Sequence, residues 1–244
     1  MMEPGFYNLD CMAAMREFPD KFFDLAVVDP PYGDAGGGVL ETRTTIWRHI
    51  RPIQNGGTDS ARDSTDTRRL RGILRTGGTW AERYGKKIIA WDTAPEKAYF
   101  EELFRVSQAQ IIWGGNYFDL PPTRCFLIWR KLTISEDFSM AMAEYAWTSF
   151  NDNAKVFECA PQGTAQEPRF HPTQKPVKLY SWILDRYAKP GYKILDTHVG
   201  SASSLVACHR AGLKYWGFEI DPTYYAKAKE RLDMETAQIT LFEI

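Results

Sequence analysis

The segment ILDTHVGSASS, at residues 194–204, is the most informative stretch for the fold. Its apolar start reads as a β-strand that ends at Asp196, and its serines read as the first turn of a helix that follows a turn at Gly200. The helix closes at Gly212, and KYWGFEID at residues 214–221 then reads as a second strand. Strand, helix and strand in this order predict parallel strands joined by a crossover helix.

The same alternation extends through the rest of the chain. The run FFDLAVVD at residues 22–29 is apolar almost throughout, as expected of a central strand buried on both faces. Thr93 and Glu96 form a capping-box pattern ahead of a helix, whereas residues 151–170 show no period and read as a peripheral element. We predict further strands at residues 5–10, 86–92, 109–118, 124–132 and 144–150, and helices at residues 11–18, 96–107, 173–191 and 223–236. The fold class that follows is α/β, with a doubly wound and mostly parallel sheet.

The turn at Gly200 has the chemistry of a cofactor site. Glycine allows the backbone to approach a ligand closely, and the free N–H groups at a helix start attract an anionic group. Glu219 ends the next strand nineteen residues later (219 − 200), where an acid can accept hydrogen bonds from ribose hydroxyls. The turn lacks the G-x-G-x-x-G pattern, so we expect a nucleoside-bearing cofactor rather than a dinucleotide. The alternative is an ordinary strand–helix turn with a surface acid.

A second motif follows the central strand, where VVDPPYG occupies residues 27–33. Its two prolines cannot donate to a ladder and therefore end the strand at a stiff corner. Asp29, the Pro30 carbonyl and the Tyr32 ring can converge there on a planar ligand that carries an exocyclic amine. The alternative is a proline-stiffened turn in which Tyr32 packs inward and Asp29 caps.

Composition limits the class of protein. The chain has 244 residues, of which 44% are hydrophobic, and four cysteines without C-x-x-C spacing. A core of useful size can therefore form without disulfides, and the thiols suit a reducing compartment. The four histidines are scattered, so we expect no metal site. Because neither a signal sequence nor a membrane-length apolar run is present, we expect a soluble cytoplasmic protein, bacterial or phage-encoded and active at the nucleoid.

Charge is unevenly distributed along the chain. Residues 36–87 contain eleven basic and five acidic side chains, a net charge of +6 (11 − 5), although the whole chain carries −1. Such a segment suits contact with a polyanion. A solvated loop without a partner is the alternative.

Taken together, the motifs resemble those of the beta-class amino-methyltransferases of DNA, which use S-adenosylmethionine and include phage and restriction-modification enzymes. In that family the D-P-P-Y motif comes early and the cofactor motif late, a circularly permuted order on a Rossmann-like fold. The matching motifs are DPPY (29–32), IIWGGNYF (111–118), AEYAWTSF (143–150), HPTQKP (171–176), ILDTHVGSASS (194–204) and GFEID (217–221). The resemblance covers most of the chain except about residues 34–86.

The resemblance implies a role for each matching residue. Asp29 and the Pro30 carbonyl would accept hydrogen bonds from the target amine, with Pro31 fixing the corner and Tyr32 stacking on the base. Cofactor-binding residues would be Asp10, Cys11, Asp29, Thr173, Lys175, Asp196, Thr197, Gly200, Ser201, Glu219 and Ile220. For Asp10, a helix cap is the alternative. Candidates for DNA contact are Arg43, Arg68, Arg69, Arg71, Arg130 and Lys131.

Two residues depart from the family pattern. Ala202 stands where glycine is frequent, and we expect it to be tolerated because alanine suits helical geometry. Arg130 stands where relatives usually carry an acid, which can alter DNA contact. Five aromatic residues could line a base pocket, although we expect most of them in the core: Trp113, Tyr117, Phe118, Trp129 and Trp147.

The sequence therefore predicts one methyltransferase domain over residues 1–244, with a basic insertion at about 34–86 and a target-recognition element at about 151–170. We expect transfer from S-adenosylmethionine to the N6 amine of an adenine flipped out of double-stranded DNA, because a base inside a duplex cannot be reached. Cytosine N4 is the near alternative. The others are a methyltransferase of RNA or protein amides and a catalytically decayed DNA-binding module. The sequence determines neither the target sequence nor the oligomeric state, and a homodimer is one of the open alternatives.

Overall fold

The structure is a computed structural model that describes residues 2–33, 93–134, 141–161, 169–171 and 173–240. The chain divides into two compact units, one formed by Met1–Pro30 and Pro95–Ile244 and the other by Pro31–Ala94. Within the second unit, a Cβ placed on Gly33 would lie 3.1 Å from the backbone nitrogen of Ala94. The chain therefore enters and leaves this unit at neighbouring points.

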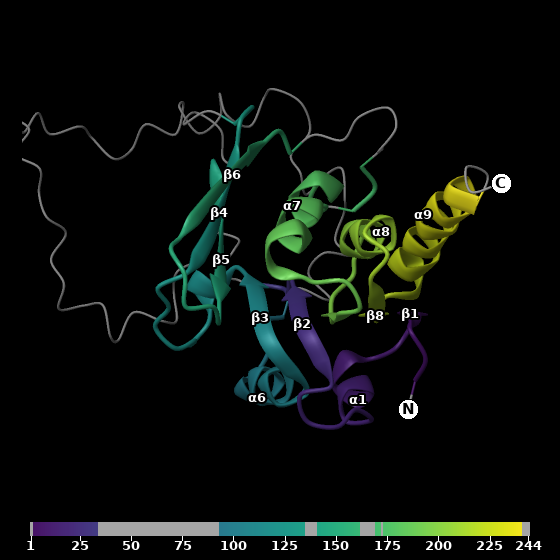
Figure 1. Cartoon of the computed structure of the whole chain (residues 1–244), viewed down its shortest axis with the longest axis horizontal. Coiled ribbons are helices and arrows are strands. Elements are labelled where there is room, and N and C mark those ends of the chain that lie inside the picture. Colours follow the sequence, from purple (N-terminus) through teal and green to yellow (C-terminus); the bar gives the residue numbers. More distant parts are fainter. Residues whose placement is uncertain (1, 34–92, 135–140, 162–168, 172, 241–244) are drawn as a thin grey trace, which may run out of the picture. The chain divides into compact units, whose positions relative to one another are not determined.

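In the described part of the first unit, eight strands form one sheet in the order β1-β8-β7-β2-β3-β5-β4-β6 (Figure 1). The strands are β1 (Gly5–Tyr7), β2 (Phe23–Val28), β3 (Ser107–Trp113), β4 (Phe126–Lys131), β5 (Ala143–Thr148), β6 (Lys155–Cys159), β7 (Lys193–Asp196) and β8 (Lys214–Phe218). Strand β5 runs antiparallel to β3 and β4, and every other neighbouring pair is parallel. The prediction of an α/β fold with a mostly parallel sheet is confirmed.

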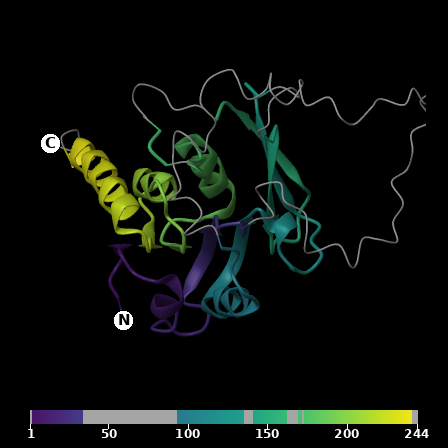
Figure 2. The same ribbon diagram turned by 180° about the vertical axis from the view of Figure 1, so that it is seen from behind.

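Helices cover both faces of the sheet, as seen from the front and from behind (Figures 1 and 2). The helices are α1 (Cys11–Met15), α6 (Lys97–Val106), α7 (Val177–Tyr187), α8 (Ser203–Arg210) and α9 (Pro222–Thr240), and η2 (Gly115–Tyr117) is a 3-10 turn. Apolar residues of α1 and α6 pack in one core cluster, and those of α7, α8 and α9 pack in another. The sheet separates the two clusters.

Strand β2 lies between the two core clusters and contributes side chains to both. Leu25 and Val27 belong to the cluster under α7 and α8, whereas Ala26 and Val28 belong to the cluster under α1 and α6. All four side chains are buried. Alternate side chains of a strand point to opposite faces, so a strand covered on both sides must be apolar at every position.

The order of strands in the sheet changes direction beside β2. Strand β2 has β3 on one side, whereas its other neighbour β7 continues to β8. Ligands of open α/β sheets bind at the carboxyl ends of strands where the strand order reverses in this way. The carboxyl ends of β2 and β7 therefore mark the place for a site.

One prediction of local structure is wrong, and one strand was not predicted. Helix α6 does not begin with a capping box at Thr93, because its N-cap is Glu96, which makes no side-chain cap hydrogen bond. A capping box would require Ala94 to be helical, and a residue that precedes proline avoids that conformation. In the region without a period, β6 was not predicted because it is a short edge strand, paired in parallel with β4.

The predicted strand at residues 86–92 lies outside the described residues. Among the helices that the structure describes, none is long and apolar enough for a membrane span.

Candidate active site

Three acidic residues lie at the carboxyl ends of neighbouring parallel strands. Asp29 follows β2, Asp196 ends β7 and Glu219 follows β8. Asp196 is buried, and the other two are partly exposed. Strand pairing thus brings together three acids that the sequence places in three separate motifs.

The turn between β7 and α8 is held against Glu219. The Gly200 N–H donates to Glu219 Oε2 at 2.9 Å, and the Asp221 N–H donates to Oε1 at 2.9 Å. Gly200 has a φ of +56°, and a Cβ at this position would lie 3.2 Å from the Cε1 of His171. Glycine is required here by the left-handed backbone and by the imidazole packed against the turn.

Ala202 differs from our expectation. It is the N-cap of α8 with a φ of +62°, so it does not adopt helical geometry. The left-handed conformation costs a residue with a Cβ about 1–2 kcal/mol. The glycine that is frequent at this position in the resembled family has no such cost.

The carboxyl group of Asp196 is unusually basic. Burial raises its pKa to about 7, and the charges of Asp29 and Glu219 add to the shift. Hydrogen bonds from the Ser204 hydroxyl and from the His198 N–H, which lies 3.0 Å from Oδ1, oppose it. Burial likewise raises the pKa of Glu219. An edge where two acids add to the raised pKa of a third favours a ligand that carries positive charge.

Asp29 belongs to a series of alternating charges. The Lys175 ammonium donates to Asp29 Oδ2 and lies 3.2 Å from Glu144 Oε2. The other oxygen of Glu144 lies 2.6 Å from the Lys131 ammonium. Both ammonium side chains are buried, with exposed fractions of 3% for Lys175 and 6% for Lys131.

Lys175 and Glu144 both keep their charges on burial. Burial lowers the pKa of Lys175, but Asp29 and Glu144 outweigh it and the net shift is upward. Burial raises the pKa of Glu144, but Lys175 and Lys131 outweigh it and the net shift is downward. Lys175 thus carries its positive charge at neutral pH, and Glu144 its negative charge.

Lys131 and Arg130 point to opposite sides of β4, as neighbours on a strand must. We expected both at the DNA. Lys131 is instead buried against Glu144, so its ammonium faces the site interior rather than a phosphate. Arg130 is exposed and donates to Glu158 on β6 at 2.8 Å, and its contact with DNA stays a prediction.

Three hydrogen-bonded polar residues precede the turn at Gly200 or pack against it. The Tyr99 hydroxyl of α6 lies 2.6 Å from Thr197 Oγ1, which lies 2.9 Å from His198 Nδ1. Burial lowers the pKa of His198 to about 4, so the imidazole is neutral at physiological pH. These bonds fix the backbone that leads into Gly200.

The segment at Asp10 also lies in the described unit. Asp10 accepts the Ala13 N–H at 2.9 Å, so it caps α1 as the alternative interpretation held. Burial raises the pKa of Cys11 to about 12, and its thiol stays protonated. Ile220 is 61% exposed, and a cofactor role for these residues stays a prediction.

The remaining predicted residues fall in the first unit, in the second unit or outside the described residues. Pro30 is buried beside Asp29, whereas Pro31 and Tyr32 belong to the second unit. Arg43, Arg68, Arg69 and Arg71 lie outside the described residues. Three of the aromatic candidates are buried in the core, as expected: Trp113, Trp129 and Trp147.

In the part of the chain that the structure describes, no group of three or more acidic, cysteine or histidine side chains could hold a metal ion.

Sequence reasoning missed Glu144, His171 and Tyr99 as site residues. Glu144 and His171 lie inside motifs that carry the family resemblance. For Glu144, the signal that could have identified it as a site residue was an acid within an otherwise apolar strand. Tyr99 gave no such signal, because a tyrosine on the buried face of a helix is ordinary core.

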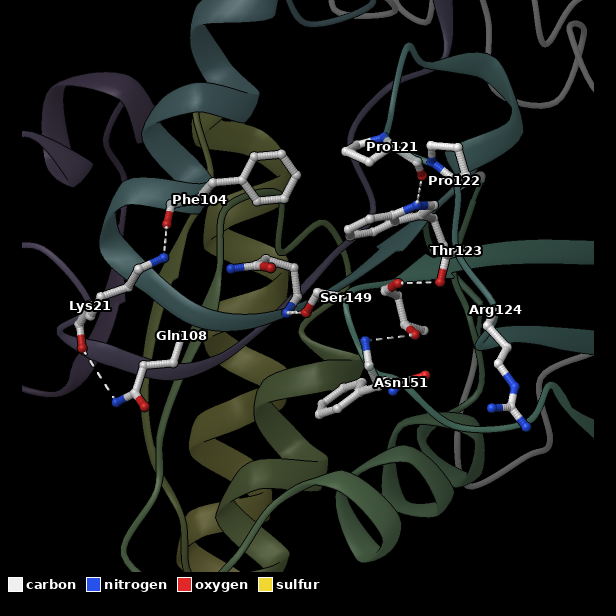
Figure 3. A pocket seen from close by; sticks show the side chains of 13 residues that line it. Lys21, Phe104, Gln108, Pro121, Pro122, Thr123, Arg124, Ser149 and Asn151 are labelled. Carbon is white, nitrogen blue, oxygen red and sulfur yellow. Dashed lines mark hydrogen bonds between the residues drawn. The ribbon is translucent and has the colours of Figure 1, made fainter.

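A pocket of about 620 Å³ lies elsewhere in the same unit (Figure 3). Gln108 of β3 and Trp147 and Thr148 of β5 line it, so it lies at the amino end of β3. The Trp147 indole donates to the Pro121 carbonyl at 2.6 Å, and the Lys21 ammonium donates to the Phe104 carbonyl at 2.6 Å. Asp29, Asp196 and Glu219 do not line it.

Comparison with known proteins matches residues 40–230 to the family described as DNA methylase, of the N6/N4 type. One relative is YubD of Escherichia coli (strain K12), which is named as a methylase. It is 34% identical over 240 residues, which is 93% of this chain and 89% of that protein. Two crystal structures share the fold. One is the M1.HpyAVI–SAM complex, with a TM-score of 0.51, 15% identity and coverage of 93% of this chain and 98% of that one. The other is the cytosine-N4-specific PvuII DNA methyltransferase, with a TM-score of 0.53, 10% identity and coverage of 98% and 93%.

Proposed function

Because this chain belongs to the N6/N4 family of DNA methylases, we propose that it transfers a methyl group from S-adenosylmethionine to the N6 amine of an adenine flipped out of duplex DNA. The observation that carries the proposal is the position of Asp29 at the carboxyl end of β2, beside the cofactor turn that follows β7. Acceptor and methyl donor would then meet at one edge of the sheet.

The residues at this edge fit the cofactor. S-adenosylmethionine carries a sulfonium and an ammonium, and an edge where the charges of Asp29 and Glu219 add to the raised pKa of Asp196 favours a ligand with positive charge. Glu219 binds the ribose hydroxyls, since each of its oxygens keeps acceptor capacity beyond its one backbone bond. Gly200 gives the turn beside Glu219 its left-handed backbone, which a residue with a side chain rarely adopts.

When bound, S-adenosylmethionine supplies a methyl group on a sulfonium, so that the amine nitrogen forms the new N–C bond, the S–C bond breaks with its electron pair going to sulfur, and one amine proton is released. Asp29 and the Pro30 carbonyl accept hydrogen bonds from the amine. These bonds localise a lone pair that the ring otherwise delocalises, and Asp29 is placed to take the released proton. Positioning and preorganised electrostatics then lower the barrier.

Duplex DNA is the partner in this proposal. The net charge of +6 over residues 36–87 suits contact with phosphates. Flipping the target base costs a few kcal/mol. The carboxylate at position 29 favours adenine, because cytosine-N4 enzymes of the resembled class more often carry serine there.

Nucleoside analysis tests the choice of base. DNA from an expressing strain without methylases of its own is digested and its nucleosides are separated by liquid chromatography with mass detection. We expect N6-methyladenine in DNA and no added methylation of RNA. N4-methylcytosine alone would establish the cytosine alternative. Unmodified DNA from a strain whose purified protein binds S-adenosylmethionine would refute the proposed transfer, and absence of cofactor binding as well would support a decayed DNA-binding module.

A further inference from the structure

Four described segments of the chain supply a connected series of ion pairs that includes Asp29. Asp29 follows β2, Lys175 precedes α7, Glu144 lies on β5 and Lys131 ends β4. Lys175 contacts both carboxylates, and Glu144 contacts both ammoniums. We name these four residues the ion-pair chain. Its charges sum to zero.

Aromatic rings restrict where the two ammoniums can lie. Lys175 Nζ lies 5.2 Å from the ring centroid of Trp113, and Lys131 Nζ lies 5.2 Å from that of Trp129. Both indoles are buried. A ring face attracts a cation but accepts no strong hydrogen bond, so the carboxylates carry most of the stabilisation of each ammonium. The ammoniums are thereby held in place.

This arrangement controls the electrostatics of Asp29. Lys175 shares its charge between Asp29 and Glu144, so Asp29 does not neutralise it alone. If Glu144 lost its charge, Asp29 alone would balance the buried ammonium, which would polarise the electrons of the Asp29 carboxylate more strongly toward itself. A carboxylate in that state accepts a hydrogen bond from a neutral amine less strongly.

We propose that Glu144 is a positioning residue for methyl transfer, which acts through Lys175 to set the orientation and acceptor strength of Asp29. The inference rests on the proposed function, in which Asp29 accepts the target amine. It also changes the role expected of Lys175, which holds Asp29 rather than the cofactor. Groups that support a catalytic side chain from behind commonly decide whether its geometry is productive.

The test is Glu144→Gln, which keeps the size of the side chain and removes its charge. Single-turnover transfer of a tritiated methyl group from S-adenosylmethionine to unmethylated genomic DNA measures the chemical step. We expect the rate constant to fall about 10- to 100-fold, whereas the dissociation constant of the cofactor, measured by calorimetry, changes less than about twofold. Glu102→Gln is the matched control, because Glu102 also forms a partly buried ion pair, 2.6 Å from Arg105, on the distant helix α6. It should leave both quantities unchanged.

The double variant Glu144→Gln/Lys131→Gln covers the case in which the single variant fails to fold. It removes one charge of each sign, so the remaining pair of Asp29 and Lys175 stays neutral, and the slow transfer should persist. A folded variant of either kind that transfers at the wild-type rate overturns the inference. So does a loss of cofactor binding that matches the loss of rate, which indicates a structural role. Wild-type protein that transfers no methyl group to DNA would refute the proposed function itself, and the inference with it.

Discussion

Asp196→Asn should make the protein more stable and its cofactor binding weaker. Asparagine has the same shape as aspartate. Its oxygen can accept the His198 N–H as in the native protein, and its amide can donate to the Ser204 hydroxyl, which reverses the native direction of that hydrogen bond but leaves both groups paired. The substitution therefore removes a buried charge with little other change.

The magnitude follows from the pKa of Asp196, which rises from 3.8 to about 7 on folding. The folded protein keeps a proton that the unfolded chain releases between about pH 4 and pH 7, so this group lowers stability as the pH rises through that window. At 1.36 kcal/mol per pKa unit, the difference in proton binding costs the folded state about 4 kcal/mol at pH 8, where the carboxyl group is ionised, and about 2 kcal/mol at pH 5, where it keeps its proton. The variant should gain these amounts, or about 10 °C in melting temperature at pH 8.

Denaturant unfolding of the cofactor-free protein at pH 5 and pH 8 measures the gain. His171 and His198, whose pKa values burial lowers to about 4, are present in both proteins and cancel in the difference. Affinity for S-adenosylmethionine should fall roughly 10- to 100-fold, the effect of losing one charged hydrogen-bond partner. Asp24→Asn is the control, since Asp24 accepts the Lys193 N–H at 2.8 Å away from the acidic edge, and it should give no gain. An equal gain at both pH values, or none at pH 8, would refute the reasoning.

Three further substitutions test other contacts. Asp29→Ala should retain cofactor binding in calorimetry but lower methyl transfer at least 100-fold, and transfer near the wild-type rate would remove Asp29 from the mechanism. Gly200→Ala should cost about 1–2 kcal/mol in denaturant unfolding, because of its positive φ and the nearby His171 ring, and an unchanged affinity for cofactor would contradict the close approach there. Gly115→Ala places a Cβ 2.4 Å from that of Trp147 and should destabilise the fold by about 1–3 kcal/mol; a melting temperature equal to wild type would show that the backbone at Trp147 has room to move.

Much of the fold could be read from the sequence because its signals are local. The apolar run of β2, the cap at Asp10 and the glycine turn before α8 each depend on a few adjacent residues. The errors arose where the backbone conformation of a single residue decided. Thr93 could not cap α6 because a proline two residues later excluded the conformation needed between them. Ala202 adopts a left-handed backbone that its position just before a helix did not reveal.

The class of fold and the acids of the site follow from the sequence alone, because the acids at 29, 196 and 219 each end an apolar run and carboxyl ends of parallel strands share one edge. The surroundings of Asp29, in contrast, depend on tertiary structure. Glu144 and Lys131 lie on antiparallel neighbours whose register sets their contact, and Lys175 arrives from a segment 146 residues beyond Asp29. No sequence period encodes such contacts, because they depend on which strands become neighbours and on which face each side chain is buried.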